Sequence, residues 1–178
     1  MTTRTEHLLP PKRQGGRAPY RIAMVCLGNI CRSPIAEVVL TEKLVRAGLD
    51  DRIEVVSAGT GGWHVGEPMD RRAAAVLAAH GYDGSEHRAA QFEAHWHDEC
   101  DLVLAMDESN HADLSDLTEG EASRLRLFRD FDPRATGSDR DVPDPYYGGD
   151  DGFAHVLATV ERTCDEIVAA LERQLDGA

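Results

Sequence analysis

The sequence has few cysteines, few aromatic residues and no long hydrophobic run. Its 178 residues include only four cysteines, without a CxxC pair or zinc-ligand spacing, so neither a disulfide framework nor a metal site is expected. No apolar stretch approaches the length of a membrane span, and the N-terminus lacks the apolar core of a secretory signal. These absences favour a reducing, cytoplasmic compartment, while export without a signal stays open.

Positive charge is also scarce. The chain has 19 Lys and Arg against 32 Asp and Glu, which gives a formal net charge of −13. Nucleic acids and anionic membranes require a basic face, so we expect neither as a partner. The acidic surplus is densest at residues 89–123, a pattern typical of a solvated surface. The 42% hydrophobic content is that of an ordinary soluble domain.

Residues 1–19 are rich in proline and glycine and show no periodicity, so we predict a disordered tail there and a single domain over 20–178. Within that domain, short apolar runs alternate with amphipathic stretches. Strands are expected at 21–25, 52–59, 101–106 and 124–128, and helices at 33–48, 70–82, 108–117 and 153–175. This alternation predicts an α/β fold, a four-stranded parallel sheet with helices on both faces. Ligands of such sheets bind beyond the carboxyl ends of the strands.

The stretch VCLGNICRSP (25–34) follows the first expected strand and has the composition of a phosphate-binding loop. Gly28 permits the backbone of a cradle, and Ser33-Pro34 begins a helix whose free N–H groups and dipole favour an anion. Arg32 offers a planar fork for two phosphate oxygens. Cys26 lies in the same positive field, which favours a thiolate able to attack phosphorus, with Ser33 as a donor to it. An ordinary glycine turn would not need this combination.

The nine residues CLGNICRSP (26–34) resemble the active-site signature of the low molecular weight protein tyrosine phosphatases. SAGT (57–60), EHRAAQ (86–91), MDESN (106–110) and DPYYG (144–148) are similar to later landmarks of that family, in the same order. The resemblance extends from about Arg21 to the end of the chain. GTGGWHVGEPMD (59–70) resembles the actinobacterial branch of the family.

The resemblance implies a role for each matching residue. Cys26 would be the nucleophile that forms a cysteinyl-phosphate, and Asp144 the general acid and then the base. Arg32 and the backbone N–H groups of the loop would hold the phosphate oxygens. The substrate-binding loop residues are Leu27, Gly28, Asn29, Ile30, Cys31 and Ser33. No metal or other cofactor is implied, the substrates would be phosphotyrosine-containing proteins, and phosphate would be both product and inhibitor.

Two groups of residues would support this site. Asn29 is expected to be a strained residue that keeps the loop open, tied by side-chain bonds to Ser57 and His87. Trp63, Tyr146 and Tyr147 are expected to form the walls of a deep slot that admits phosphotyrosine and excludes the shorter phosphoserine. The alternative for these three aromatic residues is ordinary core filling.

Asp144 lies in a segment that contains seven aspartates between residues 130 and 152. It differs from the others because Pro143 and Pro145 flank it and stiffen the backbone, as a proton donor requires. Asp130 and Asp132 are better interpreted as turn formers around Pro133.

Two other functions are alternatives to a phosphatase. An arsenate reductase resembles the family in fold and loop, but it would need a further cysteine pair late in the chain, and Cys100 and Cys164 are far apart in sequence. A non-catalytic phosphotyrosine-binding module would need neither Cys26 nor Asp144. Cys31 also allows two interpretations, a small buried filler or a resolving thiol that traps oxidised Cys26 as a disulfide.

Overall fold

The computed structural model describes residues 5–15, 19–118 and 122–176. Its centre is a parallel sheet with the strand order β2-β1-β3-β4. The strands are β1 (Tyr20–Cys26), β2 (Ile53–Gly59), β3 (Leu102–Ala105) and β4 (Leu125–Leu127). The predicted four-stranded parallel sheet is confirmed, with strand ends that differ by at most one residue from those expected.

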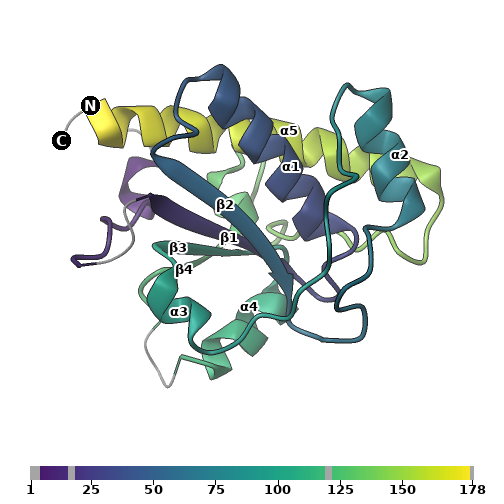
Figure 1. The fold of residues 1–178 in the computed structure, drawn as a ribbon, viewed down its shortest axis with the longest axis horizontal. Coiled ribbons are helices and arrows are strands. Elements are labelled where there is room, and N and C mark those ends of the chain that lie inside the picture. The colour runs from purple at the N-terminus through teal and green to yellow at the C-terminus, as the bar shows by residue number, and fades with distance from the viewer. Residues whose placement is uncertain (1–4, 16–18, 119–121, 177–178) are drawn as a thin grey trace.

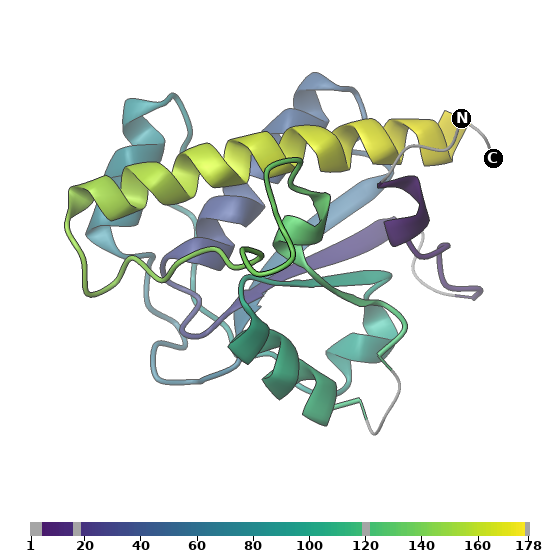
Figure 2. The same ribbon diagram turned by 180° about the vertical axis from the view of Figure 1, so that it is seen from behind.

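Helices cover both faces of this sheet (Figures 1 and 2). One face carries α1 (Arg32–Arg46), α2 (Arg71–Ala79) and the long α5 (Asp150–Asp176), and the other carries α3 (Trp96–Glu99) and α4 (Glu108–Asp116). Side chains alternate along β1, so Ile22 and Met24 join the core beneath α1 and α5, whereas Ala23 and Val25 join the second core. Both cores therefore meet at the central strand.

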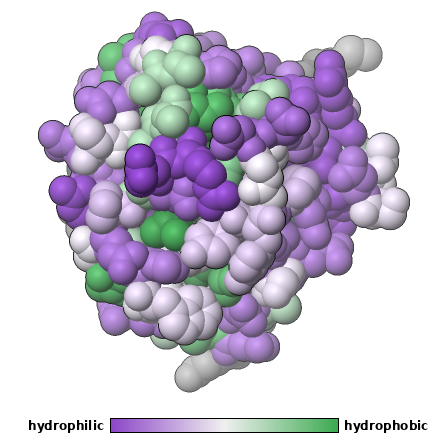
Figure 3. Space-filling view, turned by 90° about the vertical axis from the view of Figure 1, so that its right-hand side faces the viewer, coloured by the Kyte–Doolittle hydropathy of each residue, from purple (hydrophilic) through white to green (hydrophobic). Residues whose placement is uncertain are grey.

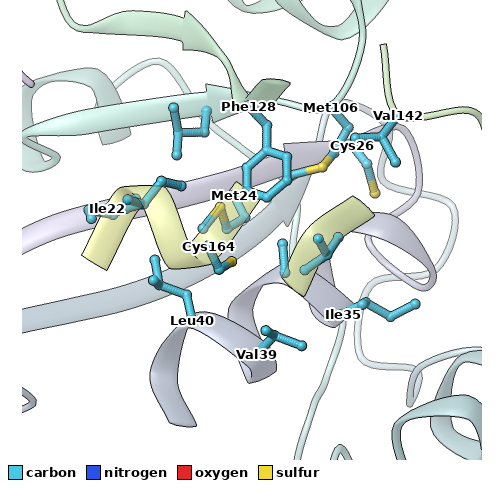
Figure 4. Packing of buried hydrophobic residues seen from close by; sticks show 14 of the residues in the cluster. Ile22, Met24, Cys26, Ile35, Val39, Leu40, Met106, Phe128, Val142 and Cys164 are labelled. Atoms are coloured by element: carbon cyan, nitrogen blue, oxygen red, sulfur yellow. The ribbon is translucent and has the colours of Figure 1, made fainter. Parts of the chain in front are cut away.

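The larger core ends at Cys26. Figure 4 shows Ile22, Met24 and Cys26 in a row along β1, with Val142 close to the Cys26 end of that row. Ile35 and Leu40 of α1 are fully buried against the strand, and burial of such a side chain stabilises the fold by about 1.5–3 kcal/mol. The thiol at the end of β1 thus rests on a densely packed base.

The start of α1 differs from the prediction. The helix begins at Arg32 with Cys31 as its N-cap residue and without a side-chain capping bond. Ser33 lies inside the first turn, and its hydroxyl faces the preceding loop, as described below. The sequence also gave no indication of α3 or of the short 3-10 helix Phe128–Phe131, since four residues are too few to show a period.

Asp132 forms the predicted turn around Pro133, since Arg134 N donates to its Oδ1 at 2.9 Å and Ala135 N donates to its carbonyl oxygen at 3.1 Å, but it has a further role in the core. Its side chain is fully buried and accepts hydrogen bonds from Arg129 Nε at 2.8 Å and Arg162 Nε at 2.7 Å. Burial opposes the ionised form, but the bonds from Arg162 and Arg129 outweigh it and lower the pKa of Asp132. Arg129 also donates to the carbonyl of Asp141 at 3.0 Å, so this ion cluster fixes the chain shortly before Asp144.

The described part of the predicted tail is packed against the domain, which corrects the expectation of disorder there. Leu9 is buried in the larger core, and the Tyr20 hydroxyl donates to the carbonyl of Pro10 at 2.7 Å. The backbone N–H of Arg13 donates to Asp101 Oδ1, also at 2.7 Å. Residues 1–4 and 16–18 of the tail lie outside the described residues. Within the described ranges, no helix combines the length and the apolar character that crossing a membrane requires.

Candidate active site

The predicted loop lies at the carboxyl end of β1, between Cys26 and the first turn of α1. It forms the floor of a cavity of about 300 Å³. The lining includes Cys26, Arg32, Trp63, Asp144, Tyr146 and Tyr147. A larger hollow of about 550 Å³ lies beside Glu37 and His87, but it contains no thiol. Figure 3 views this end of the sheet, where a mostly hydrophilic surface is interrupted by small hydrophobic areas.

Asn29 gives the loop its shape. Its φ of 59° lies in the left-handed region, which few residues other than glycine adopt, and its side chain is fully buried. The Asn29 amide donates to Ser33 Oγ at 2.8 Å and to Ser57 Oγ at 3.0 Å, and its oxygen accepts from Ala90 N at 2.9 Å. Three partners thus hold an unfavourable backbone conformation in place.

His87 also contacts Asn29, although not in the predicted way. His87 Nε2 lies 2.7 Å from the carbonyl oxygen of Asn29, so this contact is to the backbone, and of the two predicted partners Ser57 is the one that bonds the Asn29 side chain. The prediction also missed Glu37. Its Oε2 accepts from Ser57 Oγ at 3.3 Å and lies 3.5 Å from His87 Nδ1, which closes a ring of contacts behind the loop.

The inside of the loop carries the reactive group and free donors. Cys26 Sγ lies 2.9 Å from Ser33 Oγ, within hydrogen-bond distance. Within the described ranges, the backbone N–H groups of residues 28–31 donate to no other protein group. They precede the N-terminus of α1, where the helix dipole favours negative charge. The arrangement can bind an anion directly in front of the sulfur.

Arg32 is held at the edge of this cradle. Its Nη1 donates to Asp107 Oδ2 at 2.6 Å and to the carbonyl of Val142 at 3.0 Å, and the residue is only 2% exposed. Burial favours the neutral guanidine, but the Cys26 sulfur and the Asp107 carboxylate outweigh it and raise the pKa of Arg32. The guanidinium therefore stays charged at the cradle.

Asp144 reaches the same site from the loop before α5. Its Oδ2 lies 3.6 Å from Arg32 Nη2, and its Oδ1 accepts from Tyr146 N at 3.1 Å. Of the seven aspartates in the segment 130–152, it is the one that lines this cavity. The side chain is 39% exposed, so it can exchange protons with water.

The three predicted aromatic residues lie at the rim and not in the core. Trp63 is 71% exposed, Tyr147 92% and Tyr146 39%, so the core-filling alternative is wrong for all three. Tyr146 and Tyr147 contact each other edge to face with ring centroids 4.9 Å apart. His64 also lines the cavity, with Nδ1 2.7 Å from Glu67 Oε2, although it was not predicted to belong to this site.

Gly59 is a third residue, after Glu37 and His64, that was not predicted to belong to the site. It pairs with Cys26 across the sheet, and a Cβ at this position would lie 2.7 Å from the carbonyl oxygen of Leu27. The next nearest atoms, at 3.0 and 3.1 Å, are backbone atoms of Gly28 and Asn29. Only glycine allows β2 to support the loop so closely.

Cys31 is buried at the base of the cradle. Burial, followed by the Asp70 carboxylate and the Cys26 sulfur, raises the pKa of its thiol to about 12. Cys31 therefore stays protonated at neutral pH. Across the described residues, no three His, Cys, Asp or Glu side chains are placed to share a metal ion.

Residues 21–176 match the family described as low molecular weight phosphotyrosine protein phosphatase. The chain belongs to this family. A low molecular weight protein-tyrosine-phosphatase of Streptomyces coelicolor, an actinobacterium, is 49% identical over 160 residues, which cover 89% of this chain and 97% of that protein. The predicted family and branch are thereby confirmed.

Solved structures agree with this assignment. YfkJ from Bacillus subtilis superposes with a TM-score of 0.82 at 30% identity, covering 89% of this chain and 98% of that one. A protein tyrosine phosphatase from Entamoeba histolytica, crystallised with Hepes in the active site, superposes with a TM-score of 0.81 at 32% identity. That match covers 86% of this chain and 97% of the other. The neighbours thus share the whole α/β fold of this phosphatase family.

Proposed function

We propose that this protein is a tyrosine phosphatase that hydrolyses phosphotyrosine monoesters through a cysteinyl-phosphate. The observation that carries the proposal is the grouping of Cys26, Arg32 and Asp144 around one cavity of about 300 Å³. A thiol, a charged guanidinium and a carboxyl group within one cavity are the groups that a two-step phosphoryl transfer requires. Family membership over residues 21–176 supports the same activity.

In the first step, the Cys26 sulfur attacks phosphorus and the tyrosine oxygen leaves. The N–H groups of residues 28–31 and the Arg32 guanidinium hold the three remaining oxygens and their growing charge. Asp144 gives its proton to the leaving phenolate, so the product departs as neutral tyrosine. Ser33 donates to the sulfur, which stabilises the thiolate at the start and at the end of the cycle.

In the second step, Asp144 accepts a proton from water, and the resulting hydroxide attacks the cysteinyl-phosphate. The S–P bond breaks, Cys26 leaves as a thiolate, and inorganic phosphate is released. Phosphate therefore acts as product and as competitive inhibitor. Protein groups supply all of the proton transfers and charge stabilisation in this scheme, so it needs no metal or cofactor.

The exposed rim residues Trp63, Tyr146 and Tyr147 suit a phosphotyrosine side chain within a protein substrate. A flat aromatic ring between aromatic walls reaches the floor of the cavity, whereas phosphoserine is too short to span that depth. The expected partners are phosphotyrosine-containing proteins of the cytoplasm, with no nucleic acid and no membrane among them.

An arsenate reductase is less well supported. That chemistry needs two further thiols close together to carry electrons from the active site. Cys100 and Cys164 are both fully buried, and they belong to the separate cores on opposite faces of the sheet. Hydrolysis of phosphotyrosine and phosphoserine, measured beside reduction of arsenate by the same protein, separates the two activities.

Two variants test the proposed roles. Cys26→Ser should abolish phosphotyrosine hydrolysis while phosphate binding, measured by calorimetry, is largely kept, because a hydroxyl is far less acidic than a thiol. Asp144→Asn should reduce kcat/KM for phenyl phosphate more than for p-nitrophenyl phosphate, because a good leaving group scarcely needs a proton. Residual activity of Cys26→Ser above a few per cent of wild type, or equal losses for both substrates in Asp144→Asn, would contradict the assigned roles.

A further inference from the structure

Arg72, in the first turn of α2, contacts the chain segment that follows Asp144. Its Nη2 donates to the carbonyl of Tyr146 at 3.0 Å, and its Nη1 to the carbonyl of Gly148 at 3.2 Å. The guanidinium carbon also lies 5.7 Å from the centre of the Tyr146 ring and 4.6 Å from that of Phe153. One side chain therefore holds two backbone points of this segment against the start of α5.

Arg72 is itself fixed by Asp70. The Asp70 carboxylate accepts from Arg72 Nε at 3.1 Å and from Nη2 at 3.0 Å, which is a two-point ion pair. The same carboxylate caps α2 by accepting from Arg72 N at 2.8 Å. The hydrogen bond from Arg72 lowers the pKa of Asp70, so the pair stays ionised at neutral pH.

These contacts connect the phosphate loop to the segment with the acid. The backbone N–H of Asp70 donates to the carbonyl of Ile30 at 2.8 Å, inside the loop. Beyond Arg72, the N–H of Tyr146 donates to Asp144 Oδ1 at 3.1 Å. A continuous series of contacts thus runs from Ile30 through Asp70, Arg72 and Tyr146 to Asp144.

We propose that Arg72 is a positioning residue that holds the Asp144 carboxyl above the phosphate loop. The inference rests on the proposed function, in which Asp144 transfers the proton to the leaving group. Arg72 touches no reacting atom, and it acts by fixing Tyr146 and Gly148. Proton transfer needs a donor within hydrogen-bond reach of the leaving oxygen, so a looser segment lowers the rate without weakening phosphate binding.

The test compares Arg72→Met with Arg71→Met. Methionine keeps an unbranched side chain beside Phe153 but donates no hydrogen bonds. Arg71 is the matched control, because it is exposed, carries the same charge on the same helix, and has no hydrogen bond or ion pair with another described residue. Arg71→Met should leave turnover unchanged, which separates the effect of a lost charge from that of a lost contact.

For Arg72→Met, kcat/KM for phenyl phosphate should fall by about ten- to a hundredfold, part of the ~10²–10⁴ that a general acid supplies. For dinitrophenyl phosphate the loss should stay below about threefold, since this leaving group needs little protonation. The inhibition constant of phosphate should change by less than about twofold, because the bond from Asp70 N to Ile30 remains. Arg72→Lys keeps one charged donor and should recover part of the lost rate.

A double variant decides whether the effect passes through Asp144. Adding Arg72→Met to Asp144→Asn should cause little further loss, since the acid that Arg72 positions is already absent. Fully additive losses, or an equal loss of kcat/KM for both leaving groups in Arg72→Met, would show a general structural role and overturn the proposal.

Hydrogen–deuterium exchange gives a second measurement that does not depend on turnover. Residues 143–149 should exchange faster in Arg72→Met than in wild type and Arg71→Met, while peptides from β1 and α1 exchange as before. Unchanged exchange at 143–149 would overturn the proposed positioning role of Arg72, even if activity fell. If wild type fails to hydrolyse phosphotyrosine, the proposed function is wrong, and the exchange result alone then decides whether Arg72 holds the segment.

Discussion

Replacement of Asn29 should show how much energy the protein uses to shape the phosphate loop. The Asn29 side chain is fully buried and makes three hydrogen bonds, to Ser33, Ser57 and Ala90 N. At a net value of about 1 kcal/mol each, their loss removes about 3 kcal/mol. Alanine also meets the steric penalty of φ 59°, about 1 kcal/mol more, whereas glycine adopts this conformation freely.

We therefore expect Asn29→Ala to lower the free energy of unfolding by about 4 kcal/mol and Asn29→Gly by about 3 kcal/mol, measured by urea denaturation. Both variants should weaken inhibition by phosphate, because the N–H groups no longer converge on one point. The kcat/KM for phosphotyrosine should fall by about a hundredfold, as expected for a misplacement near 1 Å. Losses of stability below about 1 kcal/mol in both variants, with unchanged phosphate inhibition, would refute the view that Asn29 maintains the loop.

Three further predictions concern the surroundings of the loop. Gly59→Ala should lower kcat/KM about a hundredfold with the sheet still folded, because its Cβ would lie 2.7 Å from the Leu27 carbonyl; near-wild-type kinetics would contradict this. Asp132→Asn should cost about 3–5 kcal/mol at pH 7 in urea denaturation. Because the pKa of Asp132 is lowered by folding, its carboxylate stabilises the fold above about pH 4, and this stabilisation is lost as the pH falls further. The free energy of unfolding of the Asn variant should therefore fall less steeply with decreasing pH than that of wild type. Cys31→Ser should stay active but lose most of the dithiothreitol-reversible recovery after peroxide, because a sulfenic acid at Cys26 then lacks a nearby thiol for condensation; equal recovery would leave Cys31 as a buried filler.

The parts of the site that are local in sequence could be predicted. Cys26, Arg32 and the helix start lie within ten residues of each other, so composition alone indicated an anion-binding turn. The sheet could also be predicted, because its four apolar runs are short and are separated by stretches with a helical period. Asp144 could be separated from its neighbours because two prolines flank it, and proline has a definite effect on the backbone.

Apart from the contacts of Asn29 with Ser57 and His87, which the family resemblance implied, contacts between distant residues could not be predicted. Glu37 meets Ser57 and His87 only after α1 has packed on the sheet, and nothing in its own surroundings in the sequence distinguishes it from the other surface-type glutamates. The prediction for the N-terminal segment was wrong for another reason. Proline and glycine are typical of disorder, but the burial of Thr5, Leu9 and Pro10 and a few hydrogen bonds suffice to hold a short segment without any periodic pattern.

The net charge of −13 and the anionic substrate place opposite demands on this protein. At physiological salt, charges beyond a Debye length of about 8 Å are largely screened, so the acidic surface acts weakly on a phosphate already inside the cavity. The phosphate is attracted at short range by Arg32, by the N–H groups of residues 28–31 and by the N-terminus of α1. Asp107 and Asp144 lie beside Arg32 and partly offset its charge, so the backbone donors have to supply much of the binding. This explains why so many residues, among them Asn29, Ser57 and Gly59, serve only to hold a short piece of backbone in one shape.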